Sequence, residues 1–154
     1  MNTVTLGPAR IGEAALISEM SRSLVEAGLP RAWTPARVAA HMRDRETLVV
    51  AAREGERLIG FAMAQFGNDR VHITLIAVLA SHQRQGVGRR LLQWIEESAV
   101  VAGLFTIKLE VRTTNLAGRR FYRTLGYREM TVLSRYYSGM EDALVLSRKL
   151  NAST

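Results

Sequence analysis

The segment at residues 83–92, with the sequence QRQGVGRRLL, constrains the fold more than any other part of the chain. It follows an apolar run of strand type at residues 73–79 and opens a predicted helix that has on one face Leu91, Leu92, Ile95 and Ala99. Glycines in such a turn let the backbone approach a ligand closely, and the first amides of a helix have no partner within it. With Arg84 and Arg89 beside these amides, the turn predicts a binding site for a phosphorylated ligand.

The spacing of the glycines separates the known kinds of phosphate loop. A dinucleotide-binding fold has G-x-G-x-x-G and a P-loop has G-x-x-x-x-G-K-[ST], and this sequence contains neither. Its pattern is Q-x-x-G-x-G, formed by Gln83, Gly86 and Gly88. Between a strand and a helix, this pattern resembles the acetyl-CoA loop of the GCN5-related N-acetyltransferases (GNAT). The alternative is an ordinary glycine-rich connection with solvated arginines.

Composition limits the classes of protein that the chain can form. With 154 residues, 47% of them hydrophobic and 23% charged, the chain is predicted to be soluble and to form a single domain, residues 1–154. No apolar run reaches the roughly 18–20 residues of a membrane span, and no signal peptide is recognisable. We therefore predict a cytoplasmic protein without a membrane partner. The chain has no cysteine, which excludes a disulfide and a cysteine nucleophile.

The charge distribution and the spacing of the histidines limit the binding partners that the chain can be expected to have. The formal net charge is +7, and a basic surface attracts anions. The arginines are spread in runs no longer than two, unlike the arm of a nucleic-acid-binding protein, so no nucleic-acid partner is expected. His41, His72 and His82 lack the spacing of metal ligands, so no metal site is predicted. The oligomeric state stays open between monomer and homodimer.

The order of the predicted elements indicates the fold class. In the first helix, Leu16, Met20 and Leu24 are four residues apart on one predicted face. The mixed order predicts an α+β domain with one sheet covered by helices. The family resemblance implies the GNAT acyl-CoA N-acyltransferase fold, in which a mixed, mostly antiparallel sheet has a splay between central strands and helices on both faces. Strands are predicted at residues 4–6, 47–53, 57–66, 71–79, 106–112, 127–133 and 143–148, and helices at 11–27, 34–45, 88–101 and 115–125.

A second motif occupies residues 109–127, LEVRTTNLAGRRFYRTLGY. Its form L-E-V-R-x-x-N-x-A-x-x-x-x-Y-x-x-L-G-[YF] resembles the RimI branch of the GNAT superfamily, whose members acetylate the N-terminal amine of a ribosomal protein. The resemblance implies an N-acetyltransferase domain that moves the acetyl group of acetyl-CoA to a primary amine in a ternary complex, with a protein N-terminus as acceptor. Acetylation of a polyamine, amino acid or antibiotic is an open alternative, as is an acyl-CoA-binding module without turnover.

Two residues of this motif carry the predicted chemistry. Acetyl transfer to an amine needs a group that removes a proton from the amine and a proton for the departing thiolate. The resemblance assigns the first role to Glu110 and the second to Tyr122, whose phenol is protonated at pH 7. Two alternatives stay open: Glu110 as a surface carboxylate paired with Lys108 or Arg112, and Tyr122 packed in the core with its hydroxyl on a carbonyl.

The remaining predicted site residues surround the cofactor and the acceptor. Loop amides are expected to bind the pyrophosphate, and the strand before the loop to bind the pantetheine arm through its main chain. Asn115 either caps a short helix or holds the pantetheine arm, or does both. Tyr136 and Tyr137 either line the acceptor groove or pack as an aromatic pair in a loop. The predicted cofactor-binding residues are Ile76, Ala77, Val78, Arg84, Gln85, Gly86, Val87, Gly88, Arg89 and Asn115.

Overall fold

One sheet of seven strands runs through residues 3–151, the part of the chain that the computed structural model describes. The ends of the predicted domain, residues 1–2 and 152–154, lie outside the described residues. The strands are β1 (Val4–Pro8), β2 (Thr47–Glu54), β3 (Arg57–Phe66), β4 (Val71–Val78), β5 (Thr106–Arg112), β6 (Arg128–Tyr137) and β7 (Glu141–Lys149). The helices are α1 (Ala14–Met20), α2 (Pro35–Met42), α3 (Val87–Val101) and α4 (Leu116–Thr124). Two 3-10 turns, η1 (Ile11–Glu13) and η3 (Ala80–His82), and a π-helical turn, η2 (Ser21–Val25), complete the set.

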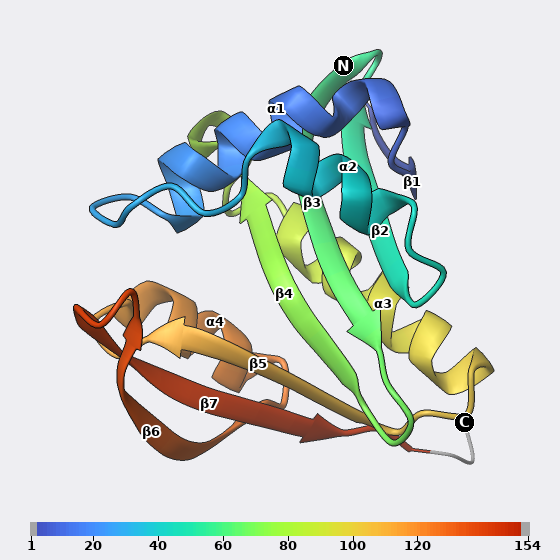
Figure 1. Ribbon diagram of the computed structural model, residues 1–154. Helices are drawn as coiled ribbons and strands as arrows, with labels where there is room; N and C mark the ends of the chain where they lie inside the picture. Colours follow the sequence, from blue (N-terminus) through green and yellow to red (C-terminus); the bar gives the residue numbers. More distant parts are fainter. Residues whose placement is uncertain (1–2, 152–154) are drawn as a thin grey trace.

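The two central strands pair over a short stretch only. In the sheet order β1-β2-β3-β4-β5-β7-β6, β4 and β5 run parallel and pair from Val71 with Ile107 to Ile73 with Leu109. The other neighbouring strands are antiparallel. Beyond Ile73, β4 and β5 diverge, and the sheet opens into two parts (Figure 1). The predicted splay in a mixed, mostly antiparallel sheet is confirmed.

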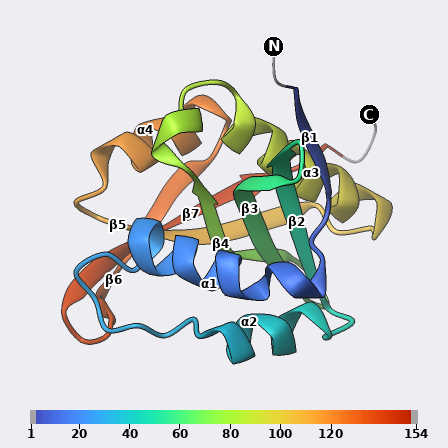
Figure 2. The same cartoon turned by 90° about the horizontal axis from the view of Figure 1, so that it is seen from above.

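Helices cover both faces of the sheet, as predicted (Figure 2). On one face, α3 buries the predicted stripe that runs from Leu91 to Ala99 against β2, β3 and β4. On the other face, Ile17 of α1 and Val38 of α2 pack on Phe61 in a second core. Burying side chains of this size stabilises a fold by about 1.5–3 kcal/mol each relative to exposure, so the two cores fix the sheet between the helix layers.

The predicted first helix is divided into η1, α1 and η2, and its predicted face is wrong. Leu16 and Leu24 are 56% and 38% exposed, and of the three predicted residues only Met20 is buried. The core side of α1 is formed by Ile17 and Ser18, neither of which is exposed. The π-helical turn then changes the rotation of the helix, so that Leu24 lines the gap between β4 and β5.

Several element boundaries also differ from prediction. Helix α2 begins as predicted, with the Thr34 side chain accepting a hydrogen bond from the Arg37 amide at 3.3 Å, but it ends at Met42 rather than at residue 45. Strands β6 and β7 extend further toward each other than predicted. Tyr136 and Tyr137 therefore end β6 and do not lie in a loop. The extension follows from the pairing of Tyr137 with Glu141, which no local sequence pattern reveals.

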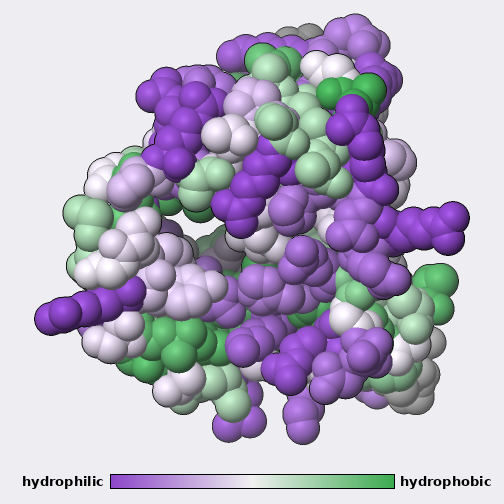
Figure 3. Space-filling view, viewed as in Figure 1, coloured by the Kyte–Doolittle hydropathy of each residue, from purple (hydrophilic) through white to green (hydrophobic). Residues whose placement is uncertain are grey.

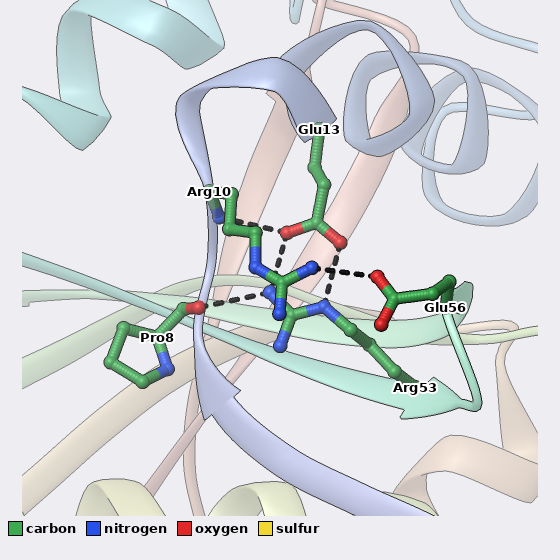
Figure 4. Close-up of polar contacts among 5 residues, drawn as sticks. All are labelled: Pro8, Arg10, Glu13, Arg53 and Glu56. Carbon is green, nitrogen blue, oxygen red and sulfur yellow. Dashed lines mark hydrogen bonds and ion pairs between the residues drawn. The ribbon is translucent and has the colours of Figure 1, made fainter.

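A buried ion pair fastens η1 to β2 (Figure 4). Both oxygens of Glu13 accept hydrogen bonds from Arg53, at 2.8 Å from Nε and 2.6 Å from Nη2. The Arg10 amide donates to the same carboxylate at 2.7 Å, and Arg53 also donates to the Pro8 carbonyl at 3.0 Å. Beside the buried pair, Arg10 and Glu56 form an exposed ion pair. The chain thus enters its first helix at a fixed place on the sheet.

Candidate active site

A cleft of about 970 Å³ opens where β4 and β5 diverge. A cavity of this size can bury a ligand as large as a nucleotide cofactor. The surface is hollowed between the same two parts of the molecule (Figure 3). Most predicted site residues line the cleft: Ile76, Ala77, Val78, Arg84, Gly86, Val87, Gly88, Arg89, Glu110, Asn115, Tyr122 and Tyr137.

The turn between β4 and α3 combines a left-handed backbone with open space. The φ angle is +62° at Arg84 and +82° at Gly86. Gln83 stabilises the turn, since its Nε2 donates to the Val78 carbonyl at 2.9 Å. Gly86 directly precedes α3, and a Cβ added there would meet no atom within 4 Å. The first amides of α3 therefore face space in which an anionic group fits, with Arg89 beside it.

Gly88 serves packing as well as the turn. A Cβ at this position would lie 3.2 Å from the ring of Phe121 in α4, which is closer than side chains normally approach one another. The next residue in α4 is Tyr122, and its ring packs against that of Phe121 at a centroid distance of 5.2 Å. The glycine thus allows α3 and α4 to approach each other beside the cleft.

Strand β4 has main-chain groups free to bind a ligand along the cleft. Its pairing with β3 passes over Thr74, because Ala64 pairs with Ile73 and Met63 with Leu75. On its other side, no described residue of β5 pairs with β4 beyond Ile73. The Thr74 hydroxyl is buried and makes no hydrogen bond to any described residue. An extended amide-containing ligand can satisfy such groups as an added strand would, which suits the pantetheine arm of coenzyme A.

Tyr122 reaches the cleft from α4. The residue is 8% exposed, and its hydroxyl forms no hydrogen bond to another residue within residues 3–151. Burial, followed by the neighbouring Tyr137, raises the pKa of Tyr122 well above its ordinary value of 10.0. The phenol is therefore protonated at neutral pH and its hydrogen is available to a ligand. The alternative in which a carbonyl occupies the hydroxyl does not hold among these residues.

Glu110 lies at the point where β5 leaves β4. Its side chain is 9% exposed, and its Oε1 lies 2.6 Å from His72 Nε2 on β4. The Tyr136 hydroxyl donates to the same oxygen at 3.3 Å. Burial acts to raise the pKa of Glu110, but the hydrogen bond and electrostatic attraction of His72, with a smaller contribution from Tyr136, lower this pKa below its ordinary value of 4.5. The carboxylate is thus ionised at neutral pH.

The predicted alternative partners of Glu110 are wrong. Arg112 instead forms an ion pair with Glu141 at 3.2 Å and donates to the Val25 carbonyl in η2 at 2.8 Å. Lys108 is no hydrogen-bond partner of Glu110 within the described residues, although its charge also lowers the pKa of Glu110. The partner is His72, which lies 38 residues earlier in the chain and was not predicted as a site residue.

Glu110 and Tyr122 reach the cleft from opposite faces of the sheet. The side chains of Ile107, Leu109 and Val111 belong to the core that also contains Tyr122. Because side chains alternate along a strand, Glu110 points to the other face, where Arg112 meets η2. A ligand lying through the gap therefore has a proton donor on one side and a carboxylate on the other.

The remaining predicted residues lie as follows. Asn115 caps α4, its Oδ1 accepting from the Gly118 amide at 3.0 Å, and it also lines the cleft. Gln85 and Tyr136 do not line the cleft. The Gln85 side chain donates to the Ser81 carbonyl at 3.3 Å, whereas Tyr136 acts on the site through Glu110. Prediction missed the cleft residues of η2, including Leu24 and Val25, because an apolar residue in a helix gives no signal for a ligand.

Two further findings concern the whole described chain. Between residues 3 and 151, no three His, Cys, Asp or Glu side chains lie together in a way that could hold a metal ion. In the same range, no helix is long and apolar enough to cross a membrane.

A glycine turn at a helix start, an unpaired strand edge and a protonated tyrosine in one cleft suit a transferase that uses an acyl-CoA thioester. The model of the acetyltransferase (GNAT) family matches residues 15–127, and the chain belongs to this family. It is accordingly an N-acetyltransferase that uses acetyl-CoA as co-substrate, as predicted.

Known relatives lie in the RimI branch. The [ribosomal protein bS18]-alanine N-acetyltransferase of Escherichia coli strain K12 is 33% identical over 122 residues, which cover 70% of this chain and 82% of that protein. The N-alpha-acetyltransferase RimI of Mycobacterium tuberculosis strain H37Rv is 30% identical over 138 residues, covering 87% and 84%. The crystal structure of the E. coli ribosomal-protein-S18-alanine N-acetyltransferase matches with a TM-score of 0.84 at 25% identity, covering 99% and 97%. The predicted resemblance to this branch is confirmed.

Proposed function

We propose that this chain acetylates the α-amine at a protein N-terminus by direct attack on acetyl-CoA in a ternary complex. The observation that carries the proposal is the ionised, weakly basic Glu110 at the acceptor side of the cleft. A weak base removes a proton only from an amine that releases one readily. The relatives described above, a ribosomal-protein alanine N-acetyltransferase and an N-alpha-acetyltransferase, support the same acceptor class.

The pKa values of the two kinds of protein amine differ enough to decide between them. An α-amine has a pKa of about 7.7–8.0 and a lysine side chain about 10.4. The difference of roughly 2.5 units corresponds to about 3.4 kcal/mol of additional cost to neutralise lysine. A carboxylate whose pKa lies below 4.5 offers little compensation for this cost. An N-terminal α-amine is therefore the acceptor that this site can use near neutral pH.

The proposed reaction uses a residue on each side of the thioester. The neutral amine attacks the carbonyl carbon, and the negative charge of Glu110 draws off the amine proton, directly or through water. The carbon–sulfur bond then breaks, and the Tyr122 hydroxyl gives its proton to the departing thiolate. Since the chain has no cysteine, no acyl-cysteine intermediate forms on the protein.

The proposed cofactor contacts follow the lining of the cleft. The amides at residues 84–89 bind the pyrophosphate, and the free edge of β4 at residues 76–78 binds the pantetheine amides. Asn115 stands beside this arm, and Tyr137 borders the acceptor. We further propose that residues 1–154 act as one N-acetyltransferase domain, since one sheet joins both halves of the chain. A ribosomal-protein acceptor would place the enzyme in the cytoplasm.

Two matched peptides test the acceptor. One has a free N-terminal alanine and a blocked lysine, and the other has a blocked N-terminus and a free lysine. Release of free coenzyme A thiol is measured with each, and with spermidine as a small amine. The expected result is turnover of the first peptide at least about tenfold faster than the second. Preference for the lysine peptide, or for spermidine alone, contradicts the proposed acceptor but leaves acetyl transfer intact.

A further inference from the structure

His72 lies beside the cleft and is not one of its lining residues, but its β4 neighbour Ile73 and its partner Glu110 are. It is the second of the three β4 residues that pair with β5, one residue before the last pair. Its Nε2 lies 2.6 Å from Glu110 Oε1, which is short even for a charge-assisted hydrogen bond. The Glu110 side chain is nearly buried at 9% exposure, whereas that of His72 is 33% exposed. Water therefore reaches the imidazole of His72, which in turn holds the carboxylate of Glu110 in place.

This arrangement gives the two residues different capacities for a proton. A carboxylate ordinarily binds a proton only in acid solution, whereas an imidazole changes charge between about pH 5 and 8. When the neutral imidazole donates its Nε2 hydrogen to Glu110, its Nδ1 retains a lone pair. An imidazolium that then forms keeps its bond to the carboxylate, whose negative charge balances it. The same division of roles makes histidine the base and the acid its orienting group in hydrolytic triads.

We propose that His72 receives the proton that the acceptor amine loses, and that Glu110 holds the imidazole and balances its charge. The inference rests on the proposed function and changes one step of it: the amine proton that the charge of Glu110 attracts is bound by His72 rather than by Glu110 itself. In the step, an N–H bond of the attacking amine breaks, the proton passes through water, and an N–H bond forms at His72 Nδ1. The electron pair left on the amine nitrogen remains in the new amide. The imidazolium later returns the proton to solvent.

The neighbouring charged and titratable groups are consistent with proton transfer to the His72–Glu110 pair. On β5, Lys108 is the strand partner of His72, and its positive charge favours the ionised form of Glu110. On β3, the partner of His72 is Gln65, which carries no charge. Around Glu110, the Tyr136 hydroxyl donates to the carboxylate, and Tyr137 interacts electrostatically with Glu110 and with the Arg112–Glu141 pair.

The test compares wild-type enzyme with His72→Gln across pH. Glutamine can still donate a hydrogen bond to Glu110, but it cannot bind a proton near neutral pH. The kcat of each form is measured between about pH 5.5 and 8.5, with whichever amine the wild type acetylates. The ratio of the two values removes the titration of the amine itself. At about pH 8 the variant is expected to be slower by about tenfold or more. The ratio should move toward one as the pH is lowered, because an imidazole that already carries a proton can accept no other.

A purely structural role for His72 predicts a different outcome. If only the hydrogen bond to Glu110 matters, the ratio stays constant with pH, and this result overturns the proposal. His41→Gln is the matched control, because His41 lies on α2 and its ring nitrogen faces the Arg37 carbonyl at 3.0 Å rather than Glu110, and its ratio should stay near one throughout. Should His72→Gln fold poorly, as judged from its Tm, His72→Ala is assayed with added imidazole. Recovery with imidazole but not with sodium chloride supports the proposal, and no recovery contradicts it.

A double variant separates a joint role from two independent ones. If His72 and Glu110 act as one unit, His72→Gln combined with Glu110→Gln is no slower than the slower single variant. Losses that multiply contradict the pairing. The acceptor proposal can fail independently of the His72 proposal. If the enzyme prefers the lysine peptide and the ratio of the two kcat values still changes with pH, only the α-amine acceptor is contradicted. If the enzyme prefers the α-amine peptide and that ratio is constant with pH, only the role of His72 is contradicted.

Discussion

Two of the nearly buried carboxylates among the described residues, Glu13 and Glu110, are each held by a basic side chain, and the two pairs differ in what they leave free. Glu13 accepts hydrogen bonds at both oxygens, and its partner Arg53 also binds the Pro8 carbonyl (Figure 4). In the other pair, His72 and Tyr136 both bind Oε1 of Glu110. Within the described residues, no hydrogen bond reaches the second oxygen of Glu110. Both oxygens of Glu13 are thus hydrogen-bonded, and we call the Glu13–Arg53 pair saturated, whereas Glu110 keeps one oxygen without a hydrogen bond among these residues.

The partners also differ in their chemistry. A guanidinium does not lose its proton in proteins, whereas an imidazole does so near neutral pH. The Glu13–Arg53 pair therefore stays charged at neutral pH, and neither residue lines the cleft. In the other pair, Glu110 lines the cleft and its partner is an imidazole. Similar burial of the two carboxylates thus accompanies a fixed junction in one place and the proposed site of proton transfer in the other.

The largest expected effect comes from breaking the saturated pair. Arg53→Met leaves Glu13 as a buried charge without its partner, and we expect a loss of about 3 kcal/mol in the free energy of unfolding. The kcat of the folded variant should not change. Denaturant unfolding and assays with acetyl-CoA measure the two quantities. Glu56→Gln, which removes the exposed neighbour of this cluster, is the control and should leave the Tm unchanged. A large loss of kcat in folded Arg53→Met would refute the division between the two pairs.

The next largest effect is expected at Tyr122, on the opposite side of the cleft from Glu110, and it is a loss of rate rather than of stability. Tyr122→Phe removes the hydroxyl predicted to protonate the thiolate, and we expect kcat to fall by about 10²-fold with little change in KM for acetyl-CoA. Because the pKa of Tyr122 lies well above 10.0, the loss should be the same from about pH 6 to 9, unlike the loss expected for His72→Gln.

Tyr127→Phe is the matched control for that experiment. Tyr127 is also buried, but its hydroxyl donates to Glu96 at 2.9 Å on the side of α3. Losing this bond should lower the stability and leave kcat close to that of the wild type. An unchanged kcat in Tyr122→Phe would assign Tyr122 to packing.

Local patterns predicted the parts of the site that depend on neighbouring residues. The turn at Gly86 and the cap at Asn115 are set within a few residues, so their motifs could be recognised directly. The face of α3 also followed from spacing, because that helix is regular throughout. The family resemblance then supplied the order of strands, including the splay.

Features that depend on contacts between distant segments could not be predicted. In the sequence, His72 is a polar residue in a strand of alternating polar and apolar residues, which gives no sign of a function. Only the pairing of β4 with β5 brings it to Glu110. The face of the first helix failed because the π-helical turn breaks the regular period and because Leu24 faces the cleft rather than the core. A pattern of apolar residues predicts only that the side chains are buried. It cannot distinguish side chains that pack in the core from side chains that line an apolar cleft.

The smallest expected effect is the response of the saturated pair to acid. The hydrogen bond from Arg53 is the largest cause that lowers the pKa of Glu13 below 4.5 in the folded chain. The unfolded chain therefore binds more protons than the folded chain as the pH falls through that value, and folding loses stability. The contribution is fully present well above pH 4.5 and declines below it. The Tm difference between wild type and Glu13→Gln should consequently shrink as the pH falls from about 6 to 3. Thermal unfolding at several pH values measures this difference, and a constant difference would mean that the charge of Glu13 contributes nothing beyond its shape.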